Sequence, residues 1–287
     1  MPQHHRPFRS VLYIPGSNPR ALDKAQNLPV DAIIFDLEDA VAPEEKVNAR
    51  AALLEALTER DYGSRVRIVR VNGLDTQWGA DDIATFSRFG PEAILLPKVE
   101  HASMLDAAQA QFDPHVAATQ TRLWAMMETP RGILNAAEIA AHARLEGFVL
   151  GTNDLAKDLG SSGRAAMQTS LQLCLLAARA ENVICIDGVY NAFRDDDGLR
   201  AESAEGRAFG FDGKSLIHPA QIAIANSIFG PTEDEITLAR RQIEAFESAQ
   251  AEGKGVAVLD GKIVENLHVA TARSLLSKAK SIAELEG

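Results

Sequence analysis

The chain has 287 residues, of which 46% are hydrophobic and 24% charged, and its formal net charge is −11. This composition is typical of a globular domain, and the excess of negative charge argues against a broad nucleic-acid-binding surface. No apolar run approaches the roughly 20 residues that span a bilayer. The two cysteines lie in apolar runs without metal-ligand spacing, which favours a cytoplasmic protein with no membrane segment and no disulfide.

Apolar runs rich in valine, isoleucine and leucine alternate with segments of helical period along most of the chain. Eight such runs occur, at 10–15, 31–39, 65–73, 93–99, 122–130, 147–155, 183–189 and 213–219. Most are nearly continuous, as expected for parallel strands that are buried on both faces. Eight strand–helix repeats predict an α/β fold, a (β/α)₈ TIM barrel. An open doubly wound sheet is the alternative, but no GxGxxG motif follows the first run.

The character of the sequence changes after residue 230. Residues 231–250 have the pattern of a long charged helix, residues 252–265 that of a hairpin with Asp260 and Gly261 at its turn, and residues 264–280 that of a last helix. We therefore predict a barrel over 1–230 and a C-terminal helix-hairpin-helix extension over 231–287. The extension either packs on the barrel or contacts a neighbouring subunit.

Polar residues follow nearly every predicted strand. In a TIM barrel the active-site groups come from the carboxyl ends of the strands and the loops after them. The second run ends with Asp36, Glu38 and Asp39, and later runs end with Arg70, Asn72, Lys98, Glu128, Asn153, Asp154, Asp187, Lys214 and His218. We therefore expect an acidic mouth of the barrel with few cations.

Carboxylate oxygens of this kind suit a hard divalent ion. Mg²⁺ is usually held by one or two carboxylates, with water and substrate oxygens completing its coordination. Glu128 and Asp154 are the predicted metal ligands. Glu38 and Asp39, together with Asp36, are expected to accept hydrogen bonds from metal-bound water. The alternative is that these acids cap helices or pair with arginines, since structural networks also gather charges.

Arg70 is the lone guanidinium among these acids. Its planar fork matches a substrate carboxylate or an oxyanion, which predicts a catalytic and substrate-binding role; the alternative is a salt bridge to one of the acids. The sequence shows no plausible Ser-His-Asp set. Lys98 is the only lysine with a serious claim as a nucleophile, and that claim is weak because no obviously apolar pocket surrounds it.

Several motifs, in order and at consistent spacing over nearly the whole chain, resemble one known family. They include DAIIFDLEDAVAPEEKVNAR, METPRGILNA, FVLGTNDLAKDLG and GKSLIHPAQI. They resemble the citrate lyase beta subunit-like group of the HpcH/HpaI aldolase superfamily. The resemblance implies a magnesium-dependent TIM barrel, usually a homotrimer. It also implies a carbon–carbon lyase that acts on a 3-hydroxyacyl thioester such as citryl-, malyl- or citramalyl-CoA.

The resemblance also implies roles for individual residues. Glu128 and Asp154 match the family's magnesium ligands, with Glu128 also next to the substrate. Arg70 matches the substrate-binding arginine, and Glu38 and Asp39 match the acidic pair behind the metal-bound waters. Three further residues lie where similar proteins contact coenzyme A, namely Arg20, Lys24 and His218.

The tail departs from the family pattern at one position. Many relatives carry an aspartate there, which reaches the active site of an adjacent subunit, whereas this chain reads GKIVE and has Glu265. Glu265 is either the catalytic base or simply an acid at a helix N-terminus.

Five functions therefore stay open at this point. The leading one is a lyase acting on a CoA thioester. The others are a citrate lyase beta subunit acting on an acyl carrier protein thioester, a malyl-CoA thioesterase-like hydrolase, an aldolase of free keto acids, and a non-catalytic acyl-CoA-binding barrel.

Overall fold

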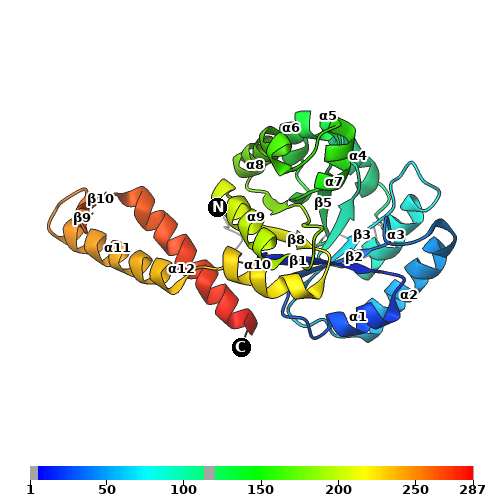
Figure 1. Ribbon diagram of the computed structural model, residues 1–287, viewed down its shortest axis with the longest axis horizontal. Coiled ribbons are helices and arrows are strands. Elements are labelled where there is room, and N and C mark those ends of the chain that lie inside the picture. The colour runs from blue at the N-terminus through cyan, green and yellow to red at the C-terminus, as the bar shows by residue number, and fades with distance from the viewer. Residues whose placement is uncertain (1–5, 113–119, 287) are drawn as a thin grey trace. The chain divides into compact units, whose positions relative to one another are not determined.

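Eight parallel strands, β1 to β8 in sequential order, close into a barrel in the computed structural model, which describes residues 6–112 and 120–286. The barrel belongs to a unit that runs from Phe8 to Asn226, and a second unit contains the C-terminal segment from Ser227 onward. Each unit is described by itself. The closed barrel confirms the TIM-barrel prediction (Figure 1).

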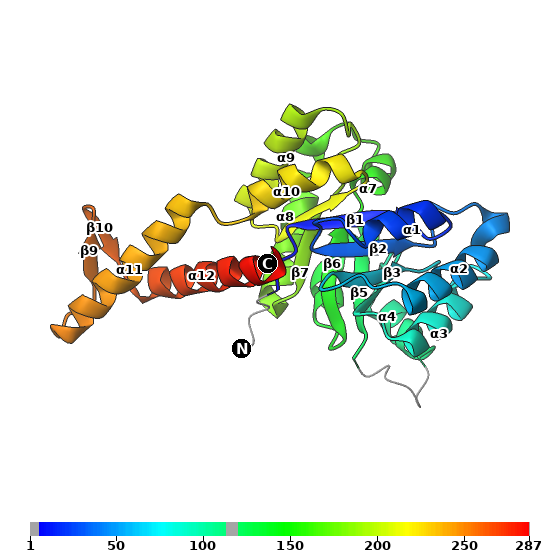
Figure 2. The same ribbon diagram turned by 90° about the horizontal axis from the view of Figure 1, so that it is seen from below.

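Each of the eight apolar runs coincides with one strand, although β6 begins two residues before its run. The strands are β1 (Ser10–Pro15), β2 (Ala32–Asp36), β3 (Val66–Arg70), β4 (Ala93–Leu96), β5 (Arg122–Met127), β6 (Leu145–Leu150), β7 (Ile184–Asp187) and β8 (Gly213–Leu216). Helices cover the outside of the barrel (Figure 2). They are α1 (Pro19–Ala25), α2 (Lys46–Glu59), α3 (Gly79–Phe89), α4 (Ala102–Gln109), α5 (Pro130–Leu134), α6 (Ala136–Ala140), α7 (Thr152–Leu159), α8 (Gln168–Glu181), α9 (Asp196–Phe209) and α10 (Ile222–Phe229).

The interior of the barrel is filled by side chains from alternate strand positions. Val11, Ile34, Ile68 and Ile186 belong to this buried cluster, which Phe8 and Trp124 close with ring centroids 5.4 Å apart. Branched aliphatic residues are the usual filling of a TIM barrel, because they interdigitate in layers.

The same alternation decides which polar residues face the mouth of the barrel. Ile34 on β2 and Ile68 on β3 point inward, so the residues two positions later, Asp36 and Arg70, stand on the same side of their strands. Asp36 and Arg70 are also register partners across the two strands. By the same spacing Glu128 follows the interior residue Met126 on β5. Strand parity thus brings these three side chains to one end of the barrel interior.

Two of the residues expected at the mouth point to the other face of their strands. Ile186 is an interior residue, so Asp187 points outward, and its register partner on β8 is Lys214. Both side chains are 0% exposed, and Lys214 Nζ contacts Glu202 on α9 at 2.7 Å. The prediction that Asp187 and Lys214 contribute to the mouth is therefore wrong, because they lie between the barrel wall and α9.

The C-terminal unit contains α11 (Glu233–Ala251), β9 (Ala257–Leu259), β10 (Lys262–Val264) and α12 (Asn266–Glu286). Asp260 and Gly261 have φ of 50° and 74°, the left-handed values that a two-residue type I′ turn requires, so the predicted hairpin is confirmed. The small core of the unit consists of Phe246, Ala249, Ala257, Val264 and Val269. No helix in the described part of the chain is long and apolar enough to cross a membrane.

Candidate active site

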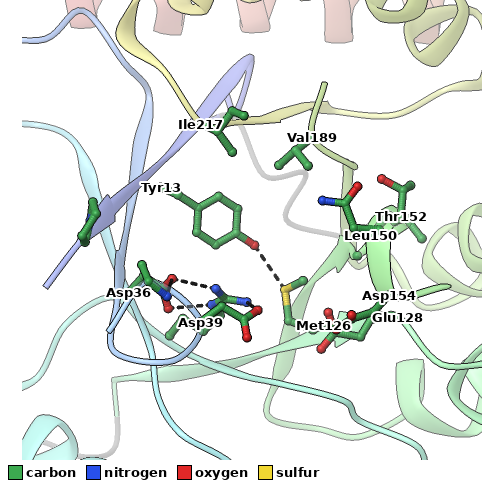
Figure 3. Close-up of a pocket in the computed structure, with 15 residues that line it drawn as sticks. Tyr13, Asp36, Asp39, Met126, Glu128, Leu150, Thr152, Asp154, Val189 and Ile217 are labelled. Carbon is green, nitrogen blue, oxygen red and sulfur yellow. Dashed lines mark hydrogen bonds and ion pairs between the residues drawn. The ribbon is translucent and has the colours of Figure 1, made fainter. Parts of the chain in front are cut away.

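A cavity of about 380 Å³ opens at the carboxyl ends of the barrel strands. Its polar lining includes Asp36, Asp39, Arg70, Glu128 and Asp154, and its apolar walls include Leu150, Val189 and Ile217. Figure 3 shows Tyr13 in the middle of this pocket, with Asp36 and Asp39 on one side and Glu128 and Asp154 on the other. The structure therefore brings both predicted metal ligands and the predicted substrate arginine into one pocket.

Arg70 is held from three sides by the acids that follow β2. Its Nε and Nη2 donate to the two carboxylate oxygens of Asp36 at 2.7 and 2.6 Å, a bidentate pair. Its Nη1 lies 2.8 Å from Glu38 and 3.2 Å from Asp39. Only 7% of Arg70 is exposed, so its charge is fixed in place at the pocket wall. The salt bridge that was the alternative role for Arg70 is present, and it leaves the arginine among the residues that line the cavity.

The loop that carries Glu38 and Asp39 is fixed by buried donors. The Asp36 carboxylate also accepts the backbone N–H groups of Glu38 and Ala40 at 2.9 and 3.1 Å. The buried ammonium of Lys46 donates to the carbonyl oxygens of Leu37 and Glu38 at 2.9 and 2.7 Å. Asp36 is thus occupied by Arg70 and by the loop backbone, and Asp39 lines the cavity beside it.

Glu38 carries an incompletely satisfied carboxylate. Its Oε2 is buried and makes no aligned hydrogen bond within the described part of the chain, although the Arg70 charge is nearby. Burial, assisted by the charges of Asp39 and Asp36, raises the pKa of Glu38 to about 7 against the opposing effect of Arg70. This oxygen forms an ion pair with Arg70 Nη1 at 2.8 Å without an aligned hydrogen bond, so it keeps acceptor capacity for a water molecule.

Glu128 is 3% exposed and has one fixed oxygen. Its Oε1 accepts the backbone N–H of Lys98 at 2.8 Å. A Cβ atom on Gly151 would lie 2.3 Å from Oε2, so only glycine leaves room for this carboxylate. Burial raises the pKa of Glu128 to about 7, with the charges of Glu38 and Asp154 adding to the effect, while the Lys98 N–H and Arg70 oppose it.

Asp154 lies in the first turn of α7, and 34% of its side chain is exposed. With Glu128 it forms a two-carboxylate donor set; no group of three or more His, Cys, Asp or Glu residues suited to a metal occurs within residues 6–112 and 120–286. A four-ligand Zn²⁺ site is therefore absent from these residues, whereas Mg²⁺ needs only one or two carboxylates together with water and substrate oxygens. The unsatisfied Glu38 oxygen is a suitable acceptor for such a water, so the residues fit Mg²⁺.

Tyr13 is a pocket residue that the sequence analysis missed. Its hydroxyl donates to Met126 Sδ at 3.3 Å, and the Arg70 guanidinium lies 5.1 Å from its ring centroid. Burial, reinforced by Asp36 and Glu128, raises the pKa of Tyr13 well above its usual value, so the hydroxyl stays protonated. The signal that could have found it is strand parity, since Val11 on β1 points inward and Tyr13 is two residues later.

The residues expected at coenzyme A do not line this cavity. Arg20 and Lys24 are exposed on α1. His218 precedes the short 3₁₀ segment Pro219–Gln221 and stacks on Phe193 with ring centroids 4.6 Å apart. Their predicted contact with coenzyme A stays a prediction.

Glu265 lies in the C-terminal unit, directly before α12, and is exposed. Its backbone N–H donates to His268 Nδ1 at 3.0 Å. Its carboxylate is not among the groups that line the cavity of this chain. The predicted role of Glu265 as a base therefore stays a prediction.

Buried carboxylates and one clamped arginine at the carboxyl end of a TIM barrel are typical of enzymes that bind an anionic substrate through a metal ion. The chain belongs to the HpcH/HpaI aldolase/citrate lyase family, whose model matches residues 9–219. This membership confirms the resemblance that the sequence motifs indicated.

Relatives match over almost the whole chain. A (3S)-malyl-CoA thioesterase from Cereibacter sphaeroides (strain ATCC 17029 / ATH 2.4.9) is 60% identical over 286 residues, which cover 99% of this chain and 98% of the relative. The citrate lyase subunit beta of Escherichia coli (strain K12) is 38% identical over 285 residues, covering 96% and 94%. The structure of CitE from Mycobacterium tuberculosis in complex with magnesium, acetoacetate and coenzyme A matches with a TM-score of 0.80 at 30% identity, covering 96% of this chain and 99% of that one.

Proposed function

We propose that this protein is a magnesium-dependent enzyme that hydrolyses (3S)-malyl-CoA, a short hydroxyacyl thioester with a free carboxylate, to malate and coenzyme A. The observation that carries the proposal is the meeting of Glu128, Asp154 and Arg70 in one pocket of a chain that is 60% identical, over 99% of its length, to a (3S)-malyl-CoA thioesterase. Hydrolysis takes precedence over the carbon–carbon cleavage expected from the sequence because the lyase relatives match at only 37–38% identity.

Glu128 and Asp154 would hold the magnesium ion. When bound, the ion supplies Lewis acidity and a template for the adjacent carboxylate and hydroxyl oxygens of the substrate. Glu38, with its unsatisfied buried oxygen, would accept a hydrogen bond from water at the metal, and Asp39 would add a second acceptor.

Arg70 would bind negative charge on the substrate. Its guanidinium is fixed by Asp36 before the substrate arrives, so little reorganisation is needed when an oxyanion forms beside it. In hydrolysis a water oxygen bonds to the thioester carbonyl carbon, the carbon–sulfur bond breaks, and the sulfur leaves and takes up a proton. A base must accept a proton from the attacking water, and we assign this role to Glu265.

The family resemblance supports a homotrimer, and the two cysteines in apolar runs support a cytoplasmic location. We infer a cytoplasmic homotrimer in which Glu265 of one subunit serves the pocket of its neighbour. Coenzyme A would contact Arg20, Lys24 and His218, which are exposed.

Carbon–carbon cleavage is the second candidate, because citrate lyase beta subunits match nearly the whole chain. In that reaction the same substrate would give acetyl-CoA and an oxo acid, and no thiol would appear. A citrate lyase beta subunit would also need an acyl carrier protein thioester and partner chains. An aldolase would instead turn over free keto acids, and a non-catalytic barrel would bind acyl-CoA without turnover.

The test is to incubate the purified full-length chain with (3S)-malyl-CoA and to follow free thiol and oxo acid separately, with Mg²⁺ and with a chelator. We expect one thiol per substrate consumed, no oxo acid, and loss of the reaction when the metal is chelated. Oxo acid and acetyl-CoA without thiol would instead establish the lyase. If neither free thiol nor oxo acid forms, both candidates are overturned.

Glu128→Gln is the most direct test of the metal site. The amide keeps the size of the side chain but loses the charge, so we expect kcat to fall by at least about 1,000-fold and the Mg²⁺ affinity to fall by at least about 100-fold. Glu181→Gln, on the exposed surface of α8, is the matched control and should change neither quantity. Turnover that survives in folded Glu128→Gln would show that the metal site is assigned to the wrong residue.

A further inference from the structure

Lys98, two residues after the end of β4, has a left-handed backbone with φ of 49°. Within the described residues the other non-glycine positions with positive φ are Asn182 and Asp260, with φ of 58° and 50°. Asparagine and aspartate tolerate this conformation because their short polar side chains hydrogen-bond locally, whereas lysine has no such compensation. Strain of this kind is retained where the surrounding structure enforces it, and it gathers at functional sites.

The backbone conformation accounts for one contact at the site. It directs the Lys98 N–H to Glu128 Oε1 at 2.8 Å. Glycine would provide the same N–H without strain, so this hydrogen bond explains the left-handed conformation but not the lysine.

The side chain accounts for a second contact. Lys98 Nζ lies 3.8 Å from Asp154 Oδ2, and this is the ion pair that Asp154 makes within the described residues. One residue therefore contacts both carboxylates of the metal site, Glu128 through its backbone and Asp154 through its ammonium group. The Lys98 side chain is 56% exposed and that of Asp154 is 34% exposed, so the ammonium group can move into solvent and leave Asp154 in contact with water.

We propose that Lys98 is a positioning residue whose ammonium group is the exchangeable counter-ion of Asp154: it holds that carboxylate in the metal-free protein and is displaced when a divalent cation binds. The inference rests on the proposed metal site and extends it. A divalent cation and the ammonium compete for the same carboxylate, and the two positive charges repel each other at short range. Lys98 therefore stabilises the empty site and lowers its affinity for the metal.

The experiment measures Mg²⁺ binding to the full-length chain by calorimetry without substrate, and thermal unfolding with and without Mg²⁺. Lys98→Met and Lys98→Gly both remove the ammonium, and Lys98→Gly also keeps the left-handed backbone without strain. We expect both variants to bind Mg²⁺ about three- to tenfold more tightly than the wild type, because a repelling charge at a partly exposed position is gone. Lys98→Arg keeps the charge and should stay within about twofold of the wild-type affinity.

Asn182→Gly is the matched control, because it makes the same kind of change at a left-handed position that ends α8. It should leave the Mg²⁺ affinity unchanged. Mg²⁺ should also raise the unfolding temperature of Lys98→Met and Lys98→Gly by more than it raises that of the wild type. If Lys98→Met or Lys98→Gly folds and binds Mg²⁺ as weakly as the wild type or more weakly, the proposal fails.

The two proposals fail in different ways. If the wild type binds no Mg²⁺, or if the Glu128→Gln variant binds Mg²⁺ as tightly as the wild type, the assignment of the metal site is wrong. The proposed role of Lys98 is then wrong as well. If Glu128→Gln removes binding while the Lys98 variants keep the wild-type affinity, only the inference about Lys98 is overturned.

Discussion

Two clusters of charged side chains at the ends of barrel strands have opposite characters. The mouth cluster consists of Arg70 with Asp36, Glu38 and Asp39; of these, Arg70, Asp36 and Asp39 line the cavity. The wall cluster lies between the barrel and α9 and consists of Lys214, Arg164, Asp187, Glu202 and Glu205. The mouth cluster sets one cation against three acids, whereas the wall cluster sets two cations against three acids.

The two clusters differ in how far each acid is paired with a cation of the protein. In the wall cluster Asp187 is 0% exposed and receives Lys214 at 3.0 Å and Arg164 at 2.9 Å, so its charge is compensated within the protein. Near the mouth cluster, burial raises the pKa values of Glu38 and of the neighbouring Glu128 to about 7, and the charges of nearby acids add a smaller effect. An acidic group that its own protein leaves uncompensated can bind a cation from solution, which is what the proposed function requires.

Lys214→Met should produce the largest loss of stability, because it leaves the buried Asp187 charge without one of its two cations. Breaking a buried ion pair from one side costs about 3–5 kcal/mol, which chemical denaturation would measure. We expect kcat/KM of the folded variant to stay within about twofold of the wild type. If Lys214→Met kept full stability but lost activity, the wall cluster would belong to the active site, and the two clusters would not differ in role.

Arg70→Lys should show the reverse pattern. Lysine keeps the charge but loses the bidentate fork, so we expect kcat/KM to fall roughly 100-fold, equivalent to about 3 kcal/mol in the barrier. The matched control is Arg67→Lys on the same strand. Arg67 forms an ion pair with Glu92, with a nitrogen–oxygen distance of 3.0 Å, and does not line the cavity. If the two substitutions reduced kcat/KM equally, Arg70 would have no special role toward the substrate.

A smaller effect is expected in the pH dependence of the unfolding free energy, which reports the protonation of Glu128. Glu128 has a folded pKa of about 7, above its usual value of 4.5, so the folded protein holds a proton that the unfolded chain has lost. The stability from this proton is fully present below about pH 4.5 and is lost as the pH rises through 7. Without metal, Glu128→Gln should therefore gain about 2 kcal/mol in unfolding free energy relative to the wild type between pH 5 and pH 8.

Urea unfolding with a chelator at several pH values would measure this gain. Saturating Mg²⁺ should stabilise the wild type at pH 8 and leave Glu128→Gln unchanged, because only the ionised carboxylate binds the cation. A difference between the two proteins that did not vary with pH would show that Glu128 titrates normally. Glu181→Gln, as a surface control, should track the wild type at every pH.

Much of the fold could be predicted from periodicity, and the hairpin turn at Asp260 and Gly261 could be predicted from its residue types. The structure brings predicted site residues into one cavity where the chemistry of a residue and its position on its strand agree, as at Arg70 and Glu128, whose roles stay predictions. The prediction was wrong for Asp187 and Lys214, which follow the same kind of apolar run but stand on the other face of their strands. Counting two residues onward from the interior residues Ile186 and Val11 would have excluded Asp187 and included Tyr13.

The sequence by itself determined the barrel, the family and the kinds of groups at the strand ends, because these depend on local pattern and residue type. Only the tertiary structure decided which charges meet. Arg70 is clamped by Asp36 because β2 and β3 pair in that register, and the pKa of Glu128 is raised because neighbouring strands enclose it. Lys98 contacts both of the carboxylates proposed as metal ligands because its left-handed backbone brings its N–H to Glu128, directly after β5, and its side chain to Asp154 on α7. Such contacts join residues that are far apart in the chain, and the physical properties of a charge depend on how closely it is enclosed and by which partners.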